Sequence, residues 1–271
     1  MATSEQFRPD HCEEEQVDAL QQVMCELDSV EQRMQPSSKY PINLEELRGG
    51  SNTVFKVSAT SLAGQVVEGV FKPGSGEKEL WDSPRSNHEL YKRERAAYLV
   101  NVFLGQNLIP ETVIATIYGE EGSLQRFIEG AVGFRNYTGL MAWGEQTCTM
   151  ALFDYLLWNK DRQLAHILID PEENFSLIDN GLSFDYRGER LISSNLEYFT
   201  VGQLFPESLA LGIAQLTSNS SMNEALNSAL ASLLPSVVLD AFHERLGFLN
   251  RMSINRERIS RRVINRMEYY P

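Results

Sequence analysis

The stretch LLWNKDRQLAHILIDPEENFSLIDNGLSF, residues 156–184, decides how the rest of the chain is interpreted. It starts at the end of an apolar segment typical of a buried helix and turns polar over residues 159–162. Two short apolar runs follow with a polar turn between them, which predicts a tight pair of strands. The second run ends in Asp179, Asn180 and Gly181, which all favour turns. A carboxylate at the tip of an apolar strand is costly to hold there unless it binds something.

Asp161 and Asp179 are the two carboxylates that this stretch can bring together. They lie 18 residues apart, and the predicted strand pair can return the chain to one cleft. In such a cleft one carboxylate can orient or deprotonate a hydroxyl nucleophile, and the other can hold magnesium ions that bridge nucleotide phosphates. The alternative is a pair of turn aspartates that make only local hydrogen bonds. This stretch by itself leaves both interpretations open.

Length and composition describe an ordinary soluble chain. It has 271 residues, of which 42% are hydrophobic and 23% charged, and this length allows one large domain or two coupled lobes. No run reaches the roughly 18 apolar residues that a spanning helix needs, and the N-terminus is polar and acidic, unlike a signal peptide. We therefore expect a cytoplasmic protein with no transmembrane segment.

The cysteines and the net charge exclude several classes of protein. Cys12, Cys25 and Cys148 include no close pair, which argues against a disulfide framework and against a zinc site of ordinary spacing. The formal net charge of −13 argues against nonspecific nucleic-acid binding, because that binding needs clustered lysines and arginines. We expect no nucleic-acid partner.

The pattern of apolar residues predicts an α+β fold with two lobes. The β-rich half has two strand pairs and one helix, at residues 53–60, 65–73, 88–105, 111–119 and 123–130. The other half is mostly helical and surrounds the strand pair of the opening stretch, with helices at residues 145–160, 206–218, 221–234, 236–249 and 254–269. We expect an N-terminal helical extension over residues 1–40, a β-rich lobe over 41–132 and a helical lobe over 133–271.

The N-terminal extension is expected to hold a helix over about residues 13–34. One stripe of this helix carries the apolar residues Val17, Leu20, Met24, Leu27 and Met34. The stripe favours a helix that packs on its own domain, with a short coiled-coil contact as the alternative.

Two features of the β-rich half point to phosphate chemistry. The adjacent Gly49 and Gly50 allow a tight turn with unhindered N–H groups that can cover phosphates, although glycine pairs are also common in hairpins. Lys72 lies near the end of an apolar strand, where it faces either solvent or a cleft in which it can neutralise a phosphate. In a cleft it needs an acidic partner, and Glu94 can supply one, with Glu89 as the alternative.

Five segments, in order, resemble the kinase branch that contains phosphatidylinositol 3- and 4-kinases, in particular type II phosphatidylinositol 4-kinases and small bacterial relatives. GVFKP is similar to the family's nucleotide-lysine strand, and RERAAYLVNVFLGQNLIPET to its glutamate helix and the following turn. GSLQRFIEG is similar to the strand that leads into the interlobe linker. KDRQLAHILID resembles the catalytic loop and LIDNGLSF the metal-binding segment. The resemblance covers about residues 47–190 and implies a protein-kinase-like fold.

The resemblance also implies a role for each matching residue. Lys72 would contact the nucleotide phosphates, and Glu94 would hold Lys72. Asp161 would be the catalytic aspartate, and Asp179 the main magnesium ligand. The adenine pocket would be lined by residues 125–129, in particular Gln125, Phe127, Ile128 and Glu129. The phosphates would be covered by Gly49, Gly50, Ser51 and Asn52.

The chain departs from this family at two positions. His166 stands where the family has its second metal ligand, an asparagine five residues after the catalytic aspartate, and Gln163 replaces the usual histidine or glycine. An imidazole can bind a divalent ion but prefers borderline metals to magnesium. We therefore expect ATP with Mg²⁺ or Mn²⁺ as cofactors and His166 as a metal ligand. The alternative is a nucleotide-binding scaffold without kinase activity.

The resemblance implies an ATP-dependent phosphotransferase, and the acceptor hydroxyl is expected to be a Ser or Thr of a protein. A phosphoinositide is the alternative, which would make the protein a peripheral membrane protein, although the cysteine-rich insertion of type II enzymes is absent. The surface that would face the lipid is the C-terminal arginine cluster, Arg256, Arg258, Arg261, Arg262 and Arg266. Residues 185–200 occupy the position of an activation segment, where Ser193, Ser194 and Thr200 are candidates for self-phosphorylation.

Overall fold

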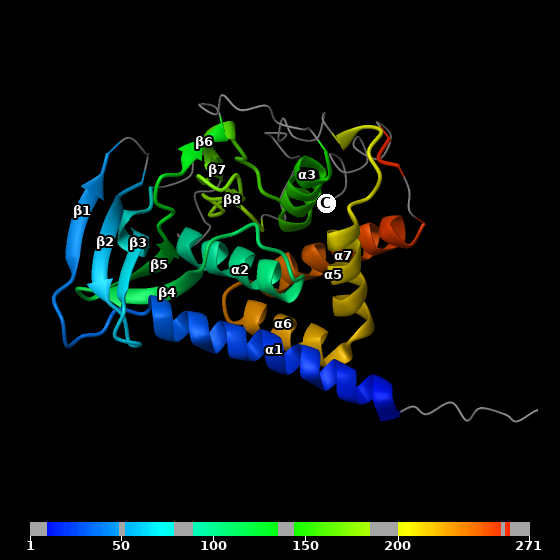
Figure 1. Ribbon diagram of the computed structural model, residues 1–271, viewed down its shortest axis with the longest axis horizontal. Helices are drawn as coiled ribbons and strands as arrows, with labels where there is room; N and C mark the ends of the chain where they lie inside the picture. The colour runs from blue at the N-terminus through cyan, green and yellow to red at the C-terminus, as the bar shows by residue number, and fades with distance from the viewer. Residues whose placement is uncertain are drawn as a thin grey trace, which may run out of the picture.

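The computed structural model describes residues 10–48, 52–78, 89–134, 144–184, 200–255 and 258–260, with side chains from residue 18 on. A β-sheet lobe is followed by a helical lobe, and a long N-terminal helix runs along both (Figure 1). The predicted α+β fold, with a β-rich N-terminal lobe and a helical C-terminal lobe, is therefore confirmed. None of the described helices is long and apolar enough to cross a membrane.

A five-stranded antiparallel sheet forms the N-terminal lobe, in the order β1-β2-β3-β5-β4. Its strands are β1 (Asn43–Leu47), β2 (Val54–Thr60), β3 (Val66–Pro73), β4 (Thr112–Ile117) and β5 (Glu120–Arg126). Buried and more exposed residues alternate along β3, and Lys72 lies on the less buried face. The register places Lys72 opposite Ser123 of β5.

The sequence pattern predicts four of these strands and misses β1. All five residues of β1 are exposed, so the strand lacks the alternation of apolar and polar residues that marks a half-buried strand. β1 lies at the edge of the sheet and pairs with β2, from Asn43 opposite Ser58 to Leu47 opposite Val54. This segment is a strand because it pairs with β2, and a local sequence pattern does not show such pairing.

The C-terminal lobe consists of helices around a small three-stranded sheet. Its elements are α3 (Glu145–Leu157), α5 (Glu207–Ser218), α6 (Ser220–Ala231), α7 (Ser236–Ile254), β6 (Val132–Gly133), β7 (Ile167–Ile169) and β8 (Phe175–Leu177). Helix α3 is buried along most of its length, as its apolar sequence predicts. It ends at Trp158, whose φ of 54° is the left-handed conformation of a helix C-cap. This cap turns the chain out of the helix and into the polar residues 159–162.

Helix α2 (Leu90–Phe103) joins the two lobes, because it packs against β4 and β5 on one side and against α6 on the other. The residue after it, Leu104, lies against Gly212 of α5. A Cβ at position 212 would come within 2.1 Å of the Leu104 carbonyl oxygen, so this approach requires a glycine. The helix that carries Glu94 is therefore held from both sides.

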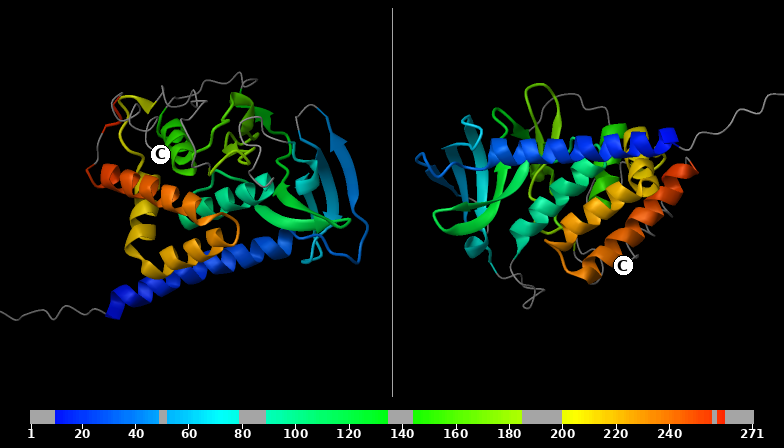
Figure 2. Two further views of the ribbon diagram at one scale, coloured as in Figure 1. Left: turned by 180° about the vertical axis from the view of Figure 1, so that it is seen from behind. Right: turned by 90° about the horizontal axis from the view of Figure 1, so that it is seen from below.

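Helix α1 (Asp10–Met34) contacts both lobes as well, since it packs against α6 and against β4 (Figures 1 and 2). Leu27, Val30 and Met34 are buried on the face of α1 that meets the core, whereas Met24 is 42% exposed. The prediction that α1 packs on its own domain is confirmed. The stripe is wrong at Met24, because Val23, four residues before Leu27, packs against the core in its place.

The C-terminal region differs from the helix predicted at residues 254–269. Helix α7 has ended before the described residues 258–260, where Arg258 forms an isolated antiparallel bridge with Leu204. Ile259 is fully buried next to this bridge. Burial and backbone pairing here outweigh helix propensity, which is a weak preference. The remaining arginines of the predicted cluster lie outside the described residues, namely Arg256, Arg261, Arg262 and Arg266.

Candidate active site between the lobes

Lys72, at the end of β3, contacts carboxylates from both lobes. Its Nζ lies 2.5 Å from Oε1 of Glu94 in α2 and 3.0 Å from Oδ1 of Asp179, which follows β8. The other carboxylate oxygen of Glu94 accepts the backbone N–H of Asn180 at 2.9 Å. Glu94 therefore holds both the lysine and the segment that carries Asp179. Glu89, the alternative partner for Lys72, pairs with Lys92 instead.

The charges in this cluster keep one another ionised. Burial by itself would lower the pKa of Lys72, but the carboxylates of Glu94 and Asp179 outweigh it, so this pKa lies above its ordinary value. The Lys72 charge lowers the pKa of Asp179 below its ordinary value, against the opposite effect of burial, with help from His166 and Arg162. At neutral pH the ammonium and the Asp179 carboxylate are both charged.

Asp179 is held in an unusual backbone conformation. Its φ of 59° lies in the left-handed region, which residues other than glycine seldom adopt. Hydrogen bonds on both sides maintain it, because the N–H of Ile178 donates to the carbonyl of His166 and the N–H of Asn180 donates to Glu94. The Asp179 side chain stays 50% exposed. This conformation directs a charged carboxylate to the boundary between the lobes.

The loop after α3 positions Asp161. The backbone N–H of Asp161 donates to the side-chain oxygen of Asn159 at 2.9 Å, and the amide of Gln163 donates to the Asp161 carboxylate at 3.0 Å. The carbonyl of Asp161 lies 2.9 Å from Nδ1 of His166. Gln163, which departs from the family pattern, thus orients the carboxylate by a direct hydrogen bond.

Arg162 connects this loop to the segment that carries Asp179, and sequence reasoning missed its role. It is buried, donates to both carboxylate oxygens of Asp154 in α3, and donates to the Ile178 carbonyl and the Asn180 side chain at 2.6 Å each. A bidentate arginine–carboxylate pair has a fixed planar geometry. The signal in the sequence is Asp154, a single acid inside the apolar run TMALFDYLL.

These side chains line a cavity of about 340 Å³ between the lobes. Its walls carry four carboxylates, those of Glu77, Glu94, Asp161 and Asp179. They also carry two lysines, Lys72 and Lys78, and the side chains of Asn52 and Thr53. The structure therefore brings together Lys72, Glu94, Asp161, Asp179 and Asn52, as the sequence predicts. Glu77 and Lys78 were not predicted, because they lie in a loop with no recognisable motif, and Thr53 was predicted only as the start of a strand.

The other predicted residues stand apart from this cavity. Gln125, Phe127, Ile128 and Glu129 are not among its lining residues. Gln125 is buried and donates to Thr112, and the N–H of Phe127 donates to the carbonyl of Glu68. The assignment of these residues to an adenine pocket stays a prediction. Several predicted residues lie outside the described residues, namely Gly49, Gly50, Ser51, Ser193 and Ser194.

Thr200 is only 2% exposed, so the prediction that it is an accessible site for self-phosphorylation is wrong. It lies at the start of the described segment that leads into α5, and packing there buries its hydroxyl group.

His166 and Asp179 form a pair of donors suited to a divalent ion. Nε2 of His166 lies 3.4 Å from Oδ2 of Asp179. Nδ1 faces the carbonyl oxygen of Asp161, which can only accept, so Nδ1 carries a proton. In the tautomer protonated only at Nδ1, the lone pair lies at Nε2, where an ion can bind. Among the described residues, no group of three or more His, Cys, Asp and Glu side chains is placed to hold an ion. His166 and Asp179 are therefore two candidate donors, and their role as metal ligands stays a prediction.

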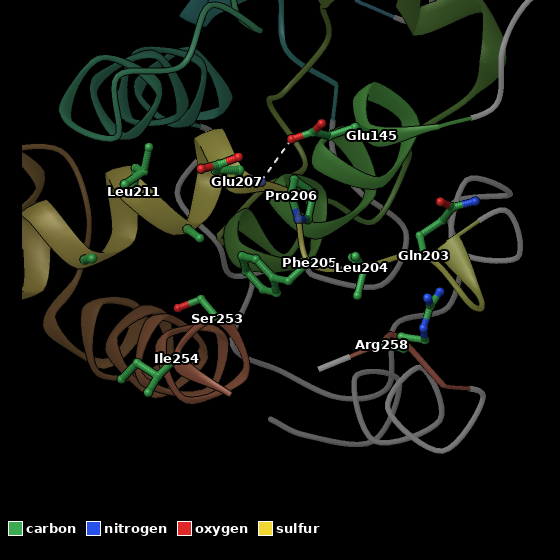
Figure 3. A pocket seen from close by; sticks show the side chains of 12 residues that line it. Glu145, Gln203, Leu204, Phe205, Pro206, Glu207, Leu211, Ser253, Ile254 and Arg258 are labelled. Carbon is green, nitrogen blue, oxygen red and sulfur yellow. Dashed lines mark hydrogen bonds between the residues drawn. The ribbon is translucent and has the colours of Figure 1, made fainter. Parts of the chain in front are cut away.

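A second and larger cavity, of about 690 Å³, lies on the helical lobe (Figure 3). It is lined by exposed apolar side chains, among them Leu204, Leu211 and Ile254. The carboxylate of Glu145 already has a partner, because it accepts the backbone N–H of Glu207 at the start of α5 (Figure 3). Among the described residues, no lysine or aspartate lines it, and its one cation is Arg258. Despite its size, this cavity lacks the converging charges of the smaller one.

Comparison with known proteins identifies relatives in sequence and in fold. No family model matches the chain. Protein Rv2133c of Mycobacterium tuberculosis is 31% identical over 174 residues, which cover 51% of this chain and 62% of the relative. The match thus spans less than two thirds of that protein's length.

Solved structures share the fold of this chain at low sequence identity. The Golgi casein kinase matches with a TM-score of 0.55 and 15% identity, over 84% of this chain and 74% of that one. The Golgi casein kinase with Mn/ADP bound matches at 0.54 and 15%, over 90% and 78%. Hydra Fam20 with sugar matches at 0.54 and 18%, over 77% and 83%. The protein-kinase-like fold is therefore confirmed, and the finer resemblance to phosphatidylinositol kinases stays a prediction.

Proposed function

We propose that the protein is an ATP-dependent kinase that transfers the γ-phosphoryl group to a hydroxyl. One observation carries this proposal. Lys72 from the β-rich lobe pairs with Asp179 from the helical lobe, on the wall of a cavity that also contains Asp161. A phosphate-binding cation, a metal-binding carboxylate and a carboxylate for the acceptor hydroxyl are the groups that phosphoryl transfer requires at one place.

The charge of the cavity supports the use of divalent ions. Among the described residues, its walls carry four carboxylates against two lysines, a formal excess of two negative charges. A nucleoside triphosphate is itself strongly anionic, and like charges at contact distance in a partly buried cavity repel strongly. Bound cations remove this repulsion, so the cavity suits a nucleotide that arrives with its metal ions.

Asp179 and His166 fit such an ion, because one offers carboxylate oxygens and the other the lone pair of Nε2. The donor set accepts Mg²⁺ and suits Mn²⁺ better, since imidazole binds the heavier ion more readily. When bound, the ion would neutralise charge on the phosphates. The neighbour that contains Mn and ADP supports this choice of nucleotide and metal.

Each of the chain's own residues at the site would then have a separate role. Lys72 would contact the phosphates, and Glu94 would keep its ammonium in place. Asp161, oriented by Gln163, would accept the hydrogen of the attacking hydroxyl. Arg162 would hold the loop of Asp161 and the segment of Asp179 in one geometry, through Asp154 and Asn180. Preorganised charges of this kind need little rearrangement during the reaction.

For the acceptor we favour a protein Ser or Thr. The support is that two structural neighbours are named as a casein kinase, and so phosphorylate a protein. The only described arginine of the cluster that a lipid acceptor would need, Arg258, donates to the carbonyl of Gly202.

The test offers radiolabelled ATP, with Mg²⁺ or Mn²⁺, to casein, to phosphatidylinositol vesicles and to free sugars in separate reactions. We expect label in protein with the wild-type chain and none with Asp161→Ala. Label only in lipid or only in sugar would reassign the acceptor. If the wild-type chain binds ATP but transfers no phosphate with either ion, it is a nucleotide-binding scaffold, and the proposed activity is wrong.

A further inference from the structure

In the described loop of residues 76–78, which follows β3, Glu77 and Lys78 line the small cavity. The backbone N–H of Lys78 donates to the side-chain oxygen of Asn52 at 3.0 Å, and the N–H of Thr53 donates to the Gly76 carbonyl at 3.1 Å. A Cβ at Gly76 would come within 2.8 Å of the Thr53 Cβ, so this contact requires a glycine. The loop is thus fastened to the segment that leads into β2.

The same loop is fastened to α2, the helix that carries Glu94. The carboxylate of Glu77 accepts the backbone N–H of Tyr91 at 2.9 Å, in the first turn of α2, where N–H groups have no partner within the helix. The Tyr91 hydroxyl in turn donates to Glu121 of β5 at 2.6 Å. The backbone around Lys78 is therefore fixed relative to the other residues of the cavity.

The two lysines of the cavity differ in what they contact. Lys72 is paired with two carboxylates, whereas Lys78 has no ion-pair partner in the part of the chain that the structure describes. The walls hold four carboxylates, yet none of them takes up the Lys78 ammonium. Lys78 is thus a charge held at the cavity wall by its backbone, with its side chain available to a ligand.

We propose that Lys78 is a second phosphate-binding lysine, which contacts the polyphosphate of the bound nucleotide. This rests on the proposed function of the cavity as a nucleotide site. The ammonium of Lys72 is already shared between Glu94 and Asp179, so an unpaired second lysine adds positive charge where the walls are acidic. Its contribution should depend on the number of phosphates and not on the base.

The test compares Lys78→Ala with a matched control, Lys39→Ala. Lys39 is also an exposed lysine, but it lies before β1 and does not line the cavity. Dissociation constants are measured for ATP, adenosine and inorganic tripolyphosphate with Mn²⁺ present. We expect Lys78→Ala to weaken ATP and tripolyphosphate binding about 10-fold, the size of one charge-assisted contact, and to leave adenosine unchanged.

Two controls separate a ligand contact from a structural role. Lys78→Arg keeps the charge and should bind ATP within about 3-fold of the wild-type chain. The melting temperature of Lys78→Ala without ligand should equal that of the wild-type chain, because no described contact uses the ammonium.

Equal ATP affinity for Lys78→Ala and the wild-type chain would overturn the proposal, and so would an equal loss in Lys39→Ala. If the wild-type chain binds neither ATP nor tripolyphosphate, the proposed function itself fails, and the role of Lys78 fails with it. If the wild-type chain binds ATP and Lys78→Ala binds it equally well, the nucleotide site stands and the role of Lys78 is wrong.

Discussion

Asp170 and Asp179 have almost the same local sequence and entirely different surroundings. Both follow a Leu-Ile pair, and both come just after a three-residue strand, β7 or β8. The carboxylate of Asp170 accepts the N–H groups of Glu172 and Asn174 and closes the turn between the strands. The carboxylate of Asp179 pairs with Lys72, 107 residues earlier in the chain. One aspartate stabilises a turn, and the other connects two lobes.

The pKa values of the two aspartates are lowered by different causes. The pKa of Asp170 lies below its ordinary value chiefly because the Asn174 side chain donates to it. The pKa of Asp179 lies below its ordinary value chiefly because of the charge on Lys72. A lowered pKa alone therefore does not mark a functional carboxylate. The origin of the partner, local or from another lobe, distinguishes the two.

The largest expected effect tests this contrast directly. Asp179→Asn should lower ATP turnover about 1,000-fold, since under the proposed function it removes the charge that holds the metal ion on the phosphates. Asp170→Asn is the matched control and should stay within about 2-fold of the wild-type rate, because its contacts are confined to the turn. Turnover is measured with Mn²⁺ at saturating ATP. Comparable losses in the two variants would show that the lobe-spanning contact has no special role.

The next prediction concerns the position of β3, because the contact between Lys72 and Asp179 depends on where this strand lies. A Cβ at Gly122 of β5 would come within 2.3 Å of the Lys72 carbonyl, so Gly122→Ala must displace the strand that carries Lys72. We expect a loss of about 1–3 kcal/mol in the free energy of unfolding from overpacking, and a fall in turnover of about 10-fold.

The control for this change is Gly247→Ala in α7. A Cβ there would meet only the Arg251 guanidinium at 3.6 Å, and alanine favours a helix, so stability should be kept or raised. Urea unfolding and ATP turnover of both variants check the prediction. Normal turnover in Gly122→Ala would show that the site tolerates a displacement of β3.

A smaller effect concerns the metal ion that we propose binds next to Asp179. His166→Asn replaces an imidazole with an amide oxygen, a harder ligand that suits Mg²⁺. We expect the ratio of turnover with Mg²⁺ to turnover with Mn²⁺ to rise about 10-fold. Rates are measured over a titration of each ion. An unchanged ratio would mean that His166 is not a metal ligand.

The smallest expected effect is that of replacing Asp170 on the stability of the protein at low pH. Because the pKa of Asp170 is lowered in the folded protein, its contribution to stability is present above the unfolded pKa of about 3.9 and is lost as pH falls through the folded pKa. Asp170→Asn should therefore flatten the decline of stability below about pH 4. Urea unfolding from pH 3 to 7 checks this. Parallel curves for the two proteins would show that Asp170 makes no such contribution.

Much of the site could be predicted from single segments, and some of it could not. Lys72, Glu94, Asp161 and Asp179 stand in recognisable positions at the ends of strands or in a helix, and the structure brings them to one cavity. Arg162 stands in the segment KDRQLAHILID, but its pairing with Asp154 of α3 depends on how the loop packs against that helix. Lys78 and β1 carry no periodic signal, since one lies in a loop and the other is exposed throughout.

The sequence by itself determined most of the elements, though not β1 or the end of α7, and the kinds of residue at their ends, because the spacing of apolar side chains and the turn-forming residues act over a few positions. The turn residues Asn180 and Gly181 and the resemblance singled out Asp179, but no local pattern fixes whether its carboxylate reaches Lys72. Only the tertiary structure decided that, since packing α2 between the sheet and α6 places Glu94 where it holds both Lys72 and Asn180. Electrostatic contacts act through space, and folding sets those distances.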